Sequence, residues 1–283
     1  MTGQAAGKGG DPVPAIREDE ATGIVAELFE DLRRTMGVPM VNLVWRHLAA
    51  MPGALDWTWG TLKPLYASGA IAAAMAALHG RMTLPPLPAM PAAALRAVGL
   101  ASADIAAVAR MLDSYDRGNS MNLLAFSTLL GRLDGMPPTA GALPETAPPP
   151  VEGRLPRLLV AAEMTPAAAE LVVRLNALGQ PEVGPIIASL YRHLAHWPGY
   201  LAMAWALLAP IDSSGALRPA IARTRSEAMS LGAVLAGRLA DPPPAPSPEV
   251  AAYVRNGLST FRDHGIARMV TIGRILRAAH PEP

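Results

Sequence analysis

An internal repeat constrains the fold of this sequence more than any other feature. Residues 38–71 align without a gap on residues 184–217, which lie 146 positions further along the chain, with 14 identities in 34 positions. Both copies contain the run Arg-His-Leu-Ala followed by a Pro-Gly step. A duplicated unit of this length predicts two related halves that pack together as a pseudo-dimer, because twofold pairing is the commonest protein assembly.

The composition favours helices. Aromatic residues are only 5% of the chain, the apolar residues are mostly Ala and Leu, and the alternation typical of strands is nearly absent. Since Ala and Leu are strong helix formers, the sequence predicts an all-α fold of two tandem helical repeats. In the first half the helices are expected at residues 21–35, at 38–50, at 53–82 with a bend at Pro64, and at 91–133 with an interruption near Gly118.

Proline clusters separate the periodic stretches. Residues 134–156 are rich in proline and poor in apolar side chains, which is typical of a stiff spacer. The Gly- and Ala-rich N-terminus has no signal-peptide pattern and reads as a flexible tail of a cytoplasmic protein. The predicted organisation is a disordered tail at 1–15, a helical repeat at 16–133, a linker at 134–156 and a second helical repeat at 157–283.

Charge, cysteine content and motifs exclude several classes of function. Lys and Arg number 24 against 23 Asp and Glu, so no broad basic surface is expected for nucleic acid. The sequence contains no run of about 18 apolar residues, so no membrane span is predicted. The chain has no cysteine, which excludes thiol chemistry. Glycine-rich phosphate loops, a Rossmann fingerprint and Gly-x-Ser-x-Gly are absent from the sequence, so no cofactor is expected.

Residues 188–201, which read Ala-Ser-Leu-Tyr-Arg-His-Leu-Ala-His-Trp-Pro-Gly-Tyr-Leu, carry a family resemblance. They are similar to the second-half signature of the group I, non-stereospecific 2-haloacid dehalogenases. The first copy of the repeat resembles the corresponding family segment, and residues 115–119 resemble its aromatic-Asn-Tyr-Gly-Asn turn. The resemblance implies a pocket between two helical halves, where an Asp, helped by an Asn, activates a water that displaces halide from the substrate's α carbon.

This sequence departs from the family at the activating acid. The family's Asp falls on Leu190, whereas its Asn falls on Asn119. Leucine cannot accept a proton, and loss of a general base typically lowers a rate by about 10² to 10⁴. The resemblance further implies that Ser189 contacts a substrate carboxylate. Met40, Asn42 and Leu43 are also expected at the pocket, with Asn42 either lining it or tied to the backbone.

Two functional hypotheses follow from the missing acid. The first is a hydrolase acting on carbon–halide bonds of 2-haloalkanoic acids, with water activated by another group. The second is a relative that binds a small carboxylate, another small molecule or a partner protein without turnover. A further homodimer is open in both cases. Candidate substitute bases are Asp116, Glu182, Asp263 and His264.

Other conspicuous residues have structural interpretations. The repeated pairs Arg46-His47 and Arg192-His193 are expected to pack, because identical residues in both halves serve the same purpose twice. The repeated Trp59 and Trp205 are expected in the core. His193 and His196 have a spacing that suits a metal, but no third ligand accompanies them, so no metal site is expected.

Overall fold

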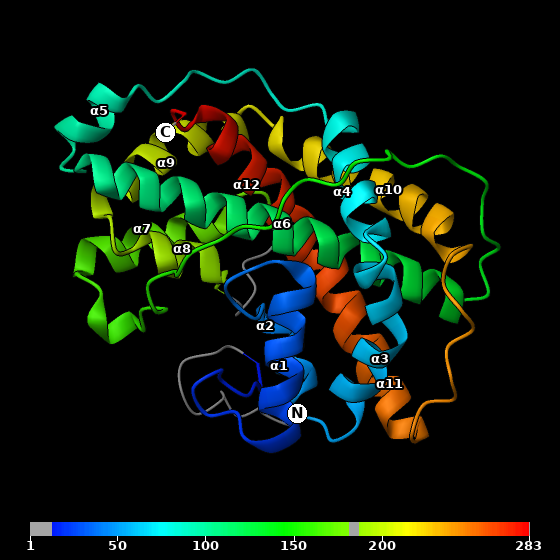
Figure 1. Ribbon diagram of the computed structural model, residues 1–283. Coiled ribbons are helices and arrows are strands. Elements are labelled where there is room, and N and C mark those ends of the chain that lie inside the picture. The colour runs from blue at the N-terminus through cyan, green and yellow to red at the C-terminus, as the bar shows by residue number, and fades with distance from the viewer. Residues whose placement is uncertain (1–12, 181–186, 283) are drawn as a thin grey trace.

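A computed structural model describes residues 13–180 and 187–282, and within these ranges the chain forms helices and no strand. The predicted all-α fold is confirmed. Figure 1 shows helices that cross one another in a single body. The elements are α1 (Gly23–Met36), α2 (Leu43–Leu48), α3 (Ala54–Ala67), α4 (Ala70–Arg81), α5 (Ala92–Ala97), α6 (Ser102–Leu133), η1 (Ala161–Glu163), α7 (Pro166–Ala177), α8 (Ser189–Leu194), α9 (Pro198–Ser213), α10 (Leu217–Ala236), α11 (Pro248–Thr260), the π-helical η2 (Phe261–Ile266) and α12 (Ala267–Ala279).

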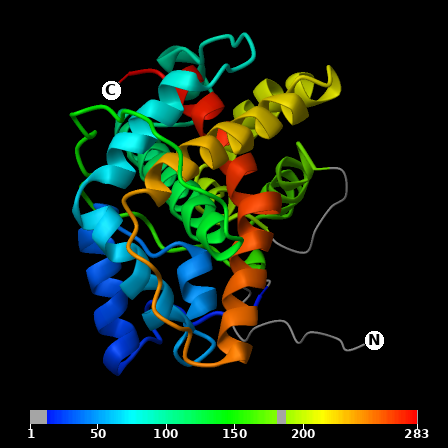
Figure 2. The same cartoon turned by 90° about the vertical axis from the view of Figure 1, so that its right-hand side faces the viewer.

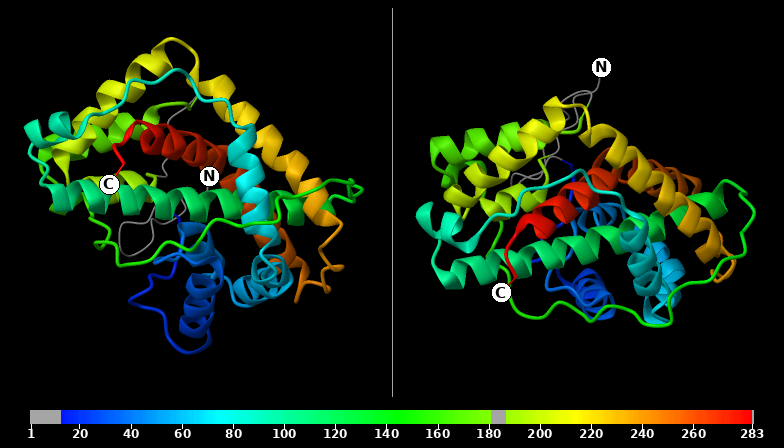
Figure 3. Two further views of the ribbon diagram at one scale, coloured as in Figure 1. Left: turned by 45° about the horizontal axis from the view of Figure 1, so that its top comes forward. Right: turned by 90° about the horizontal axis from the view of Figure 1, so that it is seen from above.

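Helix α6 is the central element. It has 32 residues and crosses most of the molecule, with α10 and α12 packed along it (Figures 1 and 3). Its side chains are buried on every face from Ser114 to Leu130. A helix that is buried all round must supply core contacts in several directions. Helix α6 therefore holds the two halves of the chain together.

Two hydrophobic cores lie along α6, and each draws residues from both sequence halves. One core combines α1–α4 with the C-terminal half of α6 and with α10 and α11. The other combines the N-terminal half of α6 with α7–α9 and α12. Figure 2 shows the exchange directly, since α11 (orange) stands beside the N-terminal helices (blue), and α11 packs on α2 and α3. The boundaries of the two repeats stay a prediction.

Two helix breaks fall at glycines and differ from the positions that the sequence predicts. The expected bend at Pro64 is wrong: Pro64 lies inside α3, and the chain turns by 73° between α3 and α4, at Gly69 with φ of 77°. The expected interruption near Gly118 is also wrong, because α6 runs through it. The break falls before α6 at Gly99, where φ is 94°. Positive φ costs other residues more than glycine, which explains both positions.

The spacer after α6 is fixed to the helices at several points. Thr139 N donates to Ala233 O at 3.0 Å, and Val151 N donates to Gly37 O at 3.0 Å. Arg117 donates from Nη1 to Pro148 O at 3.0 Å. The spacer thus follows the surface of the molecule (Figure 1).

Among the described residues no single helix is long and apolar enough to cross a membrane. Helices α3 and α4 reach that length only when taken together, and they are bent by 73°. Many of their apolar side chains are buried in the core, as expected for core helices.

Candidate functional site

A cavity of about 70 Å³ lies between the first turns of α2 and α8, beside α6 and η2. The structure brings all six site residues predicted from the sequence to its wall, although their roles stay predictions. Liquid water occupies about 30 Å³ per molecule, so the space suits roughly two to three waters or a very small organic molecule. The wall is formed by Met40, Asn42, Leu43, Val44, Tyr115, Asn119, Ala188, Ser189, Leu190, Phe261, Gly265, Ile266, Arg268 and Met269.

Helices α2 and α8 form opposite parts of this wall at matching positions of the repeat. Both have six residues, and α8 begins and ends 146 positions after α2. The three aligned pairs at their starts, 42 with 188, 43 with 189 and 44 with 190, all line the cavity. Each pair differs in residue type, whereas the Arg-His-Leu run that follows is identical. The two helices therefore present unlike side chains to the cavity and like side chains to the surrounding protein.

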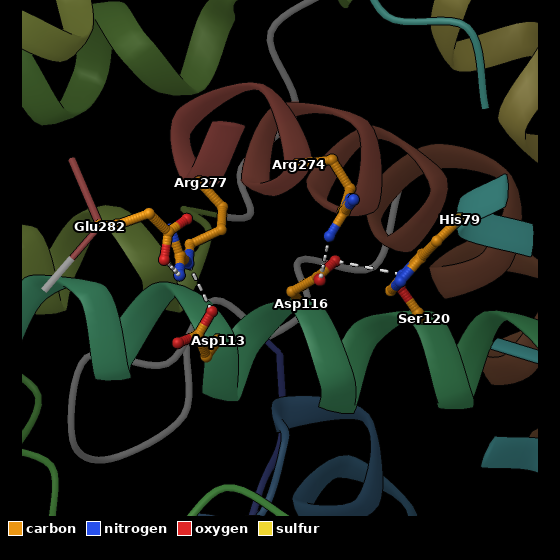
Figure 4. A network of polar contacts seen from close by, with 7 residues as sticks. All are labelled: His79, Asp113, Asp116, Ser120, Arg274, Arg277 and Glu282. Atoms are coloured by element: carbon orange, nitrogen blue, oxygen red, sulfur yellow. Dashed lines mark hydrogen bonds and ion pairs between the residues drawn. The ribbon is translucent and has the colours of Figure 1, made fainter. Parts of the chain in front are cut away.

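Helix α6 contributes Tyr115 and Asn119, which share a face because they are four residues apart. Asp116 follows Tyr115 and is turned by about 100° around the helix. Its carboxylate lies 3.0 Å from Arg274 Nη1 and 3.4 Å from His79 Nε2 (Figure 4). Asp116 is therefore held between α12 and α4 and does not line the cavity.

The other candidate bases do not reach the cavity either, where the structure describes them. Asp263 forms an ion pair with Arg262 at 2.8 Å, and His264 is exposed to solvent. Glu182 lies outside the described residues. Within those residues, the cavity wall contains no carboxylate and no histidine. Leu190, where the sequence resemblance predicts the activating acid, has an exposed fraction of 1%.

Tyr115 connects the cavity to a buried histidine. Its hydroxyl lies 2.8 Å from His193 Nδ1. Burial lowers the pKa of His193 to about 4, against a smaller opposing effect of its hydrogen bond to the Pro156 carbonyl. Burial likewise raises the pKa of Tyr115, while Arg46, Arg192 and a hydrogen bond with Ser189 lower it in part. His193 is therefore neutral near pH 7, and with its other nitrogen on the carbonyl, its Nδ1 accepts from the Tyr115 hydroxyl.

Asn42 and Asn119 line the cavity and belong to a hydrogen-bonded network beside α2. Asn42 donates from Nδ2 to Asn119 Oδ1 at 3.4 Å and accepts from Asn122 Nδ2 at 3.1 Å. Asn122 Oδ1 in turn accepts from Trp45 Nε1 at 3.0 Å. Asn42 thus lines the cavity and is held by side chains. This answers the question that the sequence left open. The amide of Asn42 fits against α6 because residue 118 is glycine, where a Cβ would lie 2.8 Å from Asn42 Oδ1.

Arg268 is a wall residue that the sequence analysis missed. It lies on α12 and its exposed fraction is 5%. Nη1 donates to Asn176 O at 2.7 Å, whereas Nε has no hydrogen-bond partner. Among the described residues it forms no ion pair with a carboxylate. The signal was present in the sequence, because Arg268 interrupts the apolar run Ile266-Ala267 and Met269-Val270.

The π-helical segment η2 forms the side of the cavity next to Arg268. Phe261, Gly265 and Ile266 line the wall, and a Cβ added at Gly265 would meet no atom within 4 Å. Segments of π-helix occur frequently at functional sites, where the extra residue per turn redirects side chains. Here the segment joins α11 to α12 and sets where Arg268 enters the wall.

The repeated tryptophans and the histidines contact the surrounding protein. Trp59 is buried in one core and Trp205 packs against the other. His47 stacks on Tyr253 with ring centroids 4.9 Å apart, and His196 Nε2 lies 2.8 Å from Arg157 O. No group of three His, Cys, Asp or Glu side chains that could hold a metal occurs in the described part of the chain.

Comparisons with known proteins agree with this helical architecture. No protein-family model matches the chain. A solved structure of D-2-haloacid dehalogenase in complex with L-LA has a TM-score of 0.70 and 19% identity, over 94% of this chain and 96% of that one. A complex of a D-2-haloacid dehalogenase mutant with D-2-CPA has a TM-score of 0.65 and 20% identity, over 94% and 93%. The chain therefore has the fold of D-2-haloacid dehalogenase.

One dehalogenase is also similar to this chain in sequence. The configuration-inverting 2-haloacid dehalogenase of Alcaligenes xylosoxydans xylosoxydans is 27% identical over 199 residues, which are 66% of this chain and 65% of the relative. The match thus spans just under two thirds of the relative's length. Sequence and fold together support homology to the 2-haloacid dehalogenases. The group I, non-stereospecific assignment and the alignment of Leu190 with the catalytic acid stay predictions from the sequence.

Proposed function

We propose that this protein binds a small 2-substituted carboxylate in the cavity between α2 and α8 and does not hydrolyse its carbon–halogen bond. The observation that carries the proposal is the composition of the wall. Leu190 stands at the position expected for the acid, and none of the described residues that line the cavity is an Asp, a Glu or a His. Relatedness to the 2-haloacid dehalogenases supplies the class of ligand.

The chemistry of displacement explains why the wall matters. Water attacks a carbon–halogen bond slowly unless a positioned group takes its proton, and in most enzymes that group is a basic side chain. The remaining polar side chains of the wall bind and orient. Ser189 and Asn119 offer hydrogen bonds, and the Tyr115 hydroxyl is held by His193. The cavity can therefore hold a ligand, while the step that breaks the bond lacks its base.

Hydrolysis through another base is the second candidate. The observation that favours it is the hydrogen bond between Tyr115, on the wall, and His193, behind the wall. A histidine with a pKa near 4 is a weak base at neutral pH, and burial disfavours its protonated form. This pair supports slow proton transfer at most. Binding without turnover remains the better supported function.

The test compares halide release by the unmodified protein with release by Leu190→Asp, using each enantiomer of 2-chloropropionate. Leu190→Asn is the matched control, because its side chain has the size of Asp but no basic oxygen. We expect no release above the buffer rate from the unmodified protein or from Leu190→Asn. Leu190→Asp should release halide at least tenfold faster than Leu190→Asn.

Each outcome bears on a different part of the proposal. Turnover by the unmodified protein would overturn binding without hydrolysis and would favour the second candidate. Equal silence of folded Leu190→Asp and Leu190→Asn would show that residue 190 is not the position of the missing base. Folding of each variant is checked by circular dichroism, since residue 190 is buried.

A further inference from the structure

The guanidinium of Arg268 is the one cationic side chain on the described wall of the cavity. It enters from α12, opposite in charge to the carboxylate that the resemblance places at residue 190. Its hydrogen bonds go to neutral oxygens, namely the backbone carbonyls of Asn176 and Leu178 and Asn176 Oδ1. Its Nε has no partner. One buried donor of Arg268 is thus left without a partner, and the side chain as a whole lines the cavity.

A buried charge without a counter-charge is costly, because the loss of water is repaid only by an opposite charge and by complete hydrogen bonding. Burial lowers the pKa of Arg268, an effect that interaction with Tyr191 opposes in part. Ion pairs satisfy the neighbouring arginines of the same helix. Arg274 contacts Asp116 at 3.0 Å, and Arg277 contacts Asp113 at 2.6 Å and Glu282 at 3.3 Å (Figure 4). Arg268 differs from both, since the described chain offers it no carboxylate.

We infer that Arg268 supplies the positive charge that selects an anionic ligand for this cavity and that the ligand's carboxylate is its counter-ion. The inference rests on the proposed function and names the group that determines its ligand class. The described wall contains no carboxylate, so no wall residue competes with the ligand for Arg268. An acid at residue 190 would compete for Arg268, whereas Leu190 leaves the guanidinium to the ligand.

The volume of the cavity limits the ligand to a short acid. At about 70 Å³ the cavity is too small for a long-chain acid, so the shortest acids are the candidates. The positive charge of Arg268 attracts the ligand's carboxylate, and this attraction is stronger in a partly buried site than in bulk water. The apolar side chains of Leu43, Leu190 and Met269 then surround the rest of the ligand.

The experiment uses two probes of equal shape, 2-chloropropionate and the neutral 2-chloropropionamide, titrated by calorimetry into the full chain. We expect the unmodified protein to bind the carboxylate at least tenfold more tightly than the amide. Arg268→Met should lose this preference through a tenfold or greater loss of carboxylate affinity, with amide affinity within twofold of the original. Arg268→Lys should retain part of the preference, since it keeps the charge but loses the fork of donors.

Arg274→Met is the matched control, because Arg274 lies on the same helix outside the cavity wall. It should bind both probes as the unmodified protein does. Equal carboxylate affinity in folded Arg268→Met, or no preference in the unmodified protein, would overturn the role of Arg268 and leave the proposed function standing. Failure of the unmodified protein to bind either probe would overturn both. If Arg268→Met does not fold, the preference of the unmodified protein and of Arg268→Lys decides.

Discussion

Helices α2 and α8 occupy equivalent places in the two sequence halves but have different surroundings. Trp45 in α2 is fully buried and donates to Asn122, which also accepts from Tyr66 and donates to Asn42. Tyr191, which aligns with Trp45, is equally buried, but its hydroxyl has no hydrogen-bond partner. The indole N–H of Trp45 is thus hydrogen-bonded, whereas the hydroxyl of its counterpart Tyr191 is not.

The comparison separates residues that maintain the fold from residues that define the site. Asn42, Asn119 and Asn122 are linked by hydrogen bonds, which fix the position of Asn42 at the cavity. On the side of α8 and α12, Tyr191 and Arg268 both retain an unpartnered polar atom. Native proteins leave few such groups, and those that remain call for an explanation. Of these two residues only Arg268 lines the cavity, where we propose that it faces the ligand.

The largest expected effect comes from removing the indole beside α2. Trp45→Ala deletes a buried side chain that packs edge-on against Trp59 and Phe126, with ring centroids 5.6 and 5.3 Å apart. Removal of a buried Trp costs about 3 to 5 kcal/mol, and Asn122 also loses a donor. Urea unfolding should show this loss in the free energy of unfolding.

Tyr191→Phe is the counterpart on α8. Because the deleted hydroxyl has no partner, we expect the free energy of unfolding to stay the same or to rise by up to about 1 kcal/mol. A loss of more than about 1 kcal/mol would contradict the claim that the two helices differ in this way.

The second prediction concerns acid stability and the histidines of the repeat. His193 has a pKa of about 4 in the folded protein, against 6.5 as its ordinary value. Between these values the unfolded chain binds a proton that the folded chain excludes, so stability falls as the pH is lowered from about 6.5 to 4. For this group the loss is on the order of 2 to 3 kcal/mol.

Urea unfolding at pH 7 and at pH 4.5 measures this loss. His193→Gln keeps an acceptor for Tyr115 but does not titrate, so the difference between the two pH values should shrink. His47→Gln is the control at the equivalent position of the first half. Burial also lowers the pKa of His47, but the smaller shift should give a smaller change. An unchanged pH difference in His193→Gln would refute the assignment.

The smallest expected effect is the difference in stability between alanine substitutions at two glycines, one on α12 and one on α6. Alanine in place of a helical glycine favours the helix by up to about 1 kcal/mol. Gly273→Ala on α12 meets no atom within 4 Å and should therefore be stabilising. Gly118→Ala places a Cβ 2.8 Å from Asn42 Oδ1, so we expect a loss of about 1 kcal/mol and weaker binding of 2-chloropropionate. Thermal unfolding with calorimetric titration compares the two, and equal effects would contradict the close contact.

Much of the cavity was predictable from the sequence, for an identifiable reason. The repeat and the family resemblance extend across residues 38–71 and 184–217 without a gap, and they locate Asn42, Ser189 and Leu190. Helix content followed from Ala and Leu. The helix content and the positions of these residues depend on short stretches of sequence, so sequence patterns predict them.

The remaining features depend on contacts between distant segments. Arg268 and η2 lie outside the aligned residues 38–71 and 184–217, so the repeat gave no indication of them. The helix breaks at Gly69 and Gly99 depend on backbone conformations that neighbouring packing selects. The mixed cores also could not be predicted, because they require α11 to cross to the N-terminal helices.

The central claim is that this cavity binds a small carboxylate and leaves its carbon–halogen bond intact. The most direct measurement is a calorimetric titration of the unmodified protein with 2-chloropropionate, followed by a halide assay of the same sample after prolonged incubation. The account predicts saturable binding to one site per chain and halide at the level of the protein-free control. Halide above that control, or no saturable heat from either enantiomer, would contradict it.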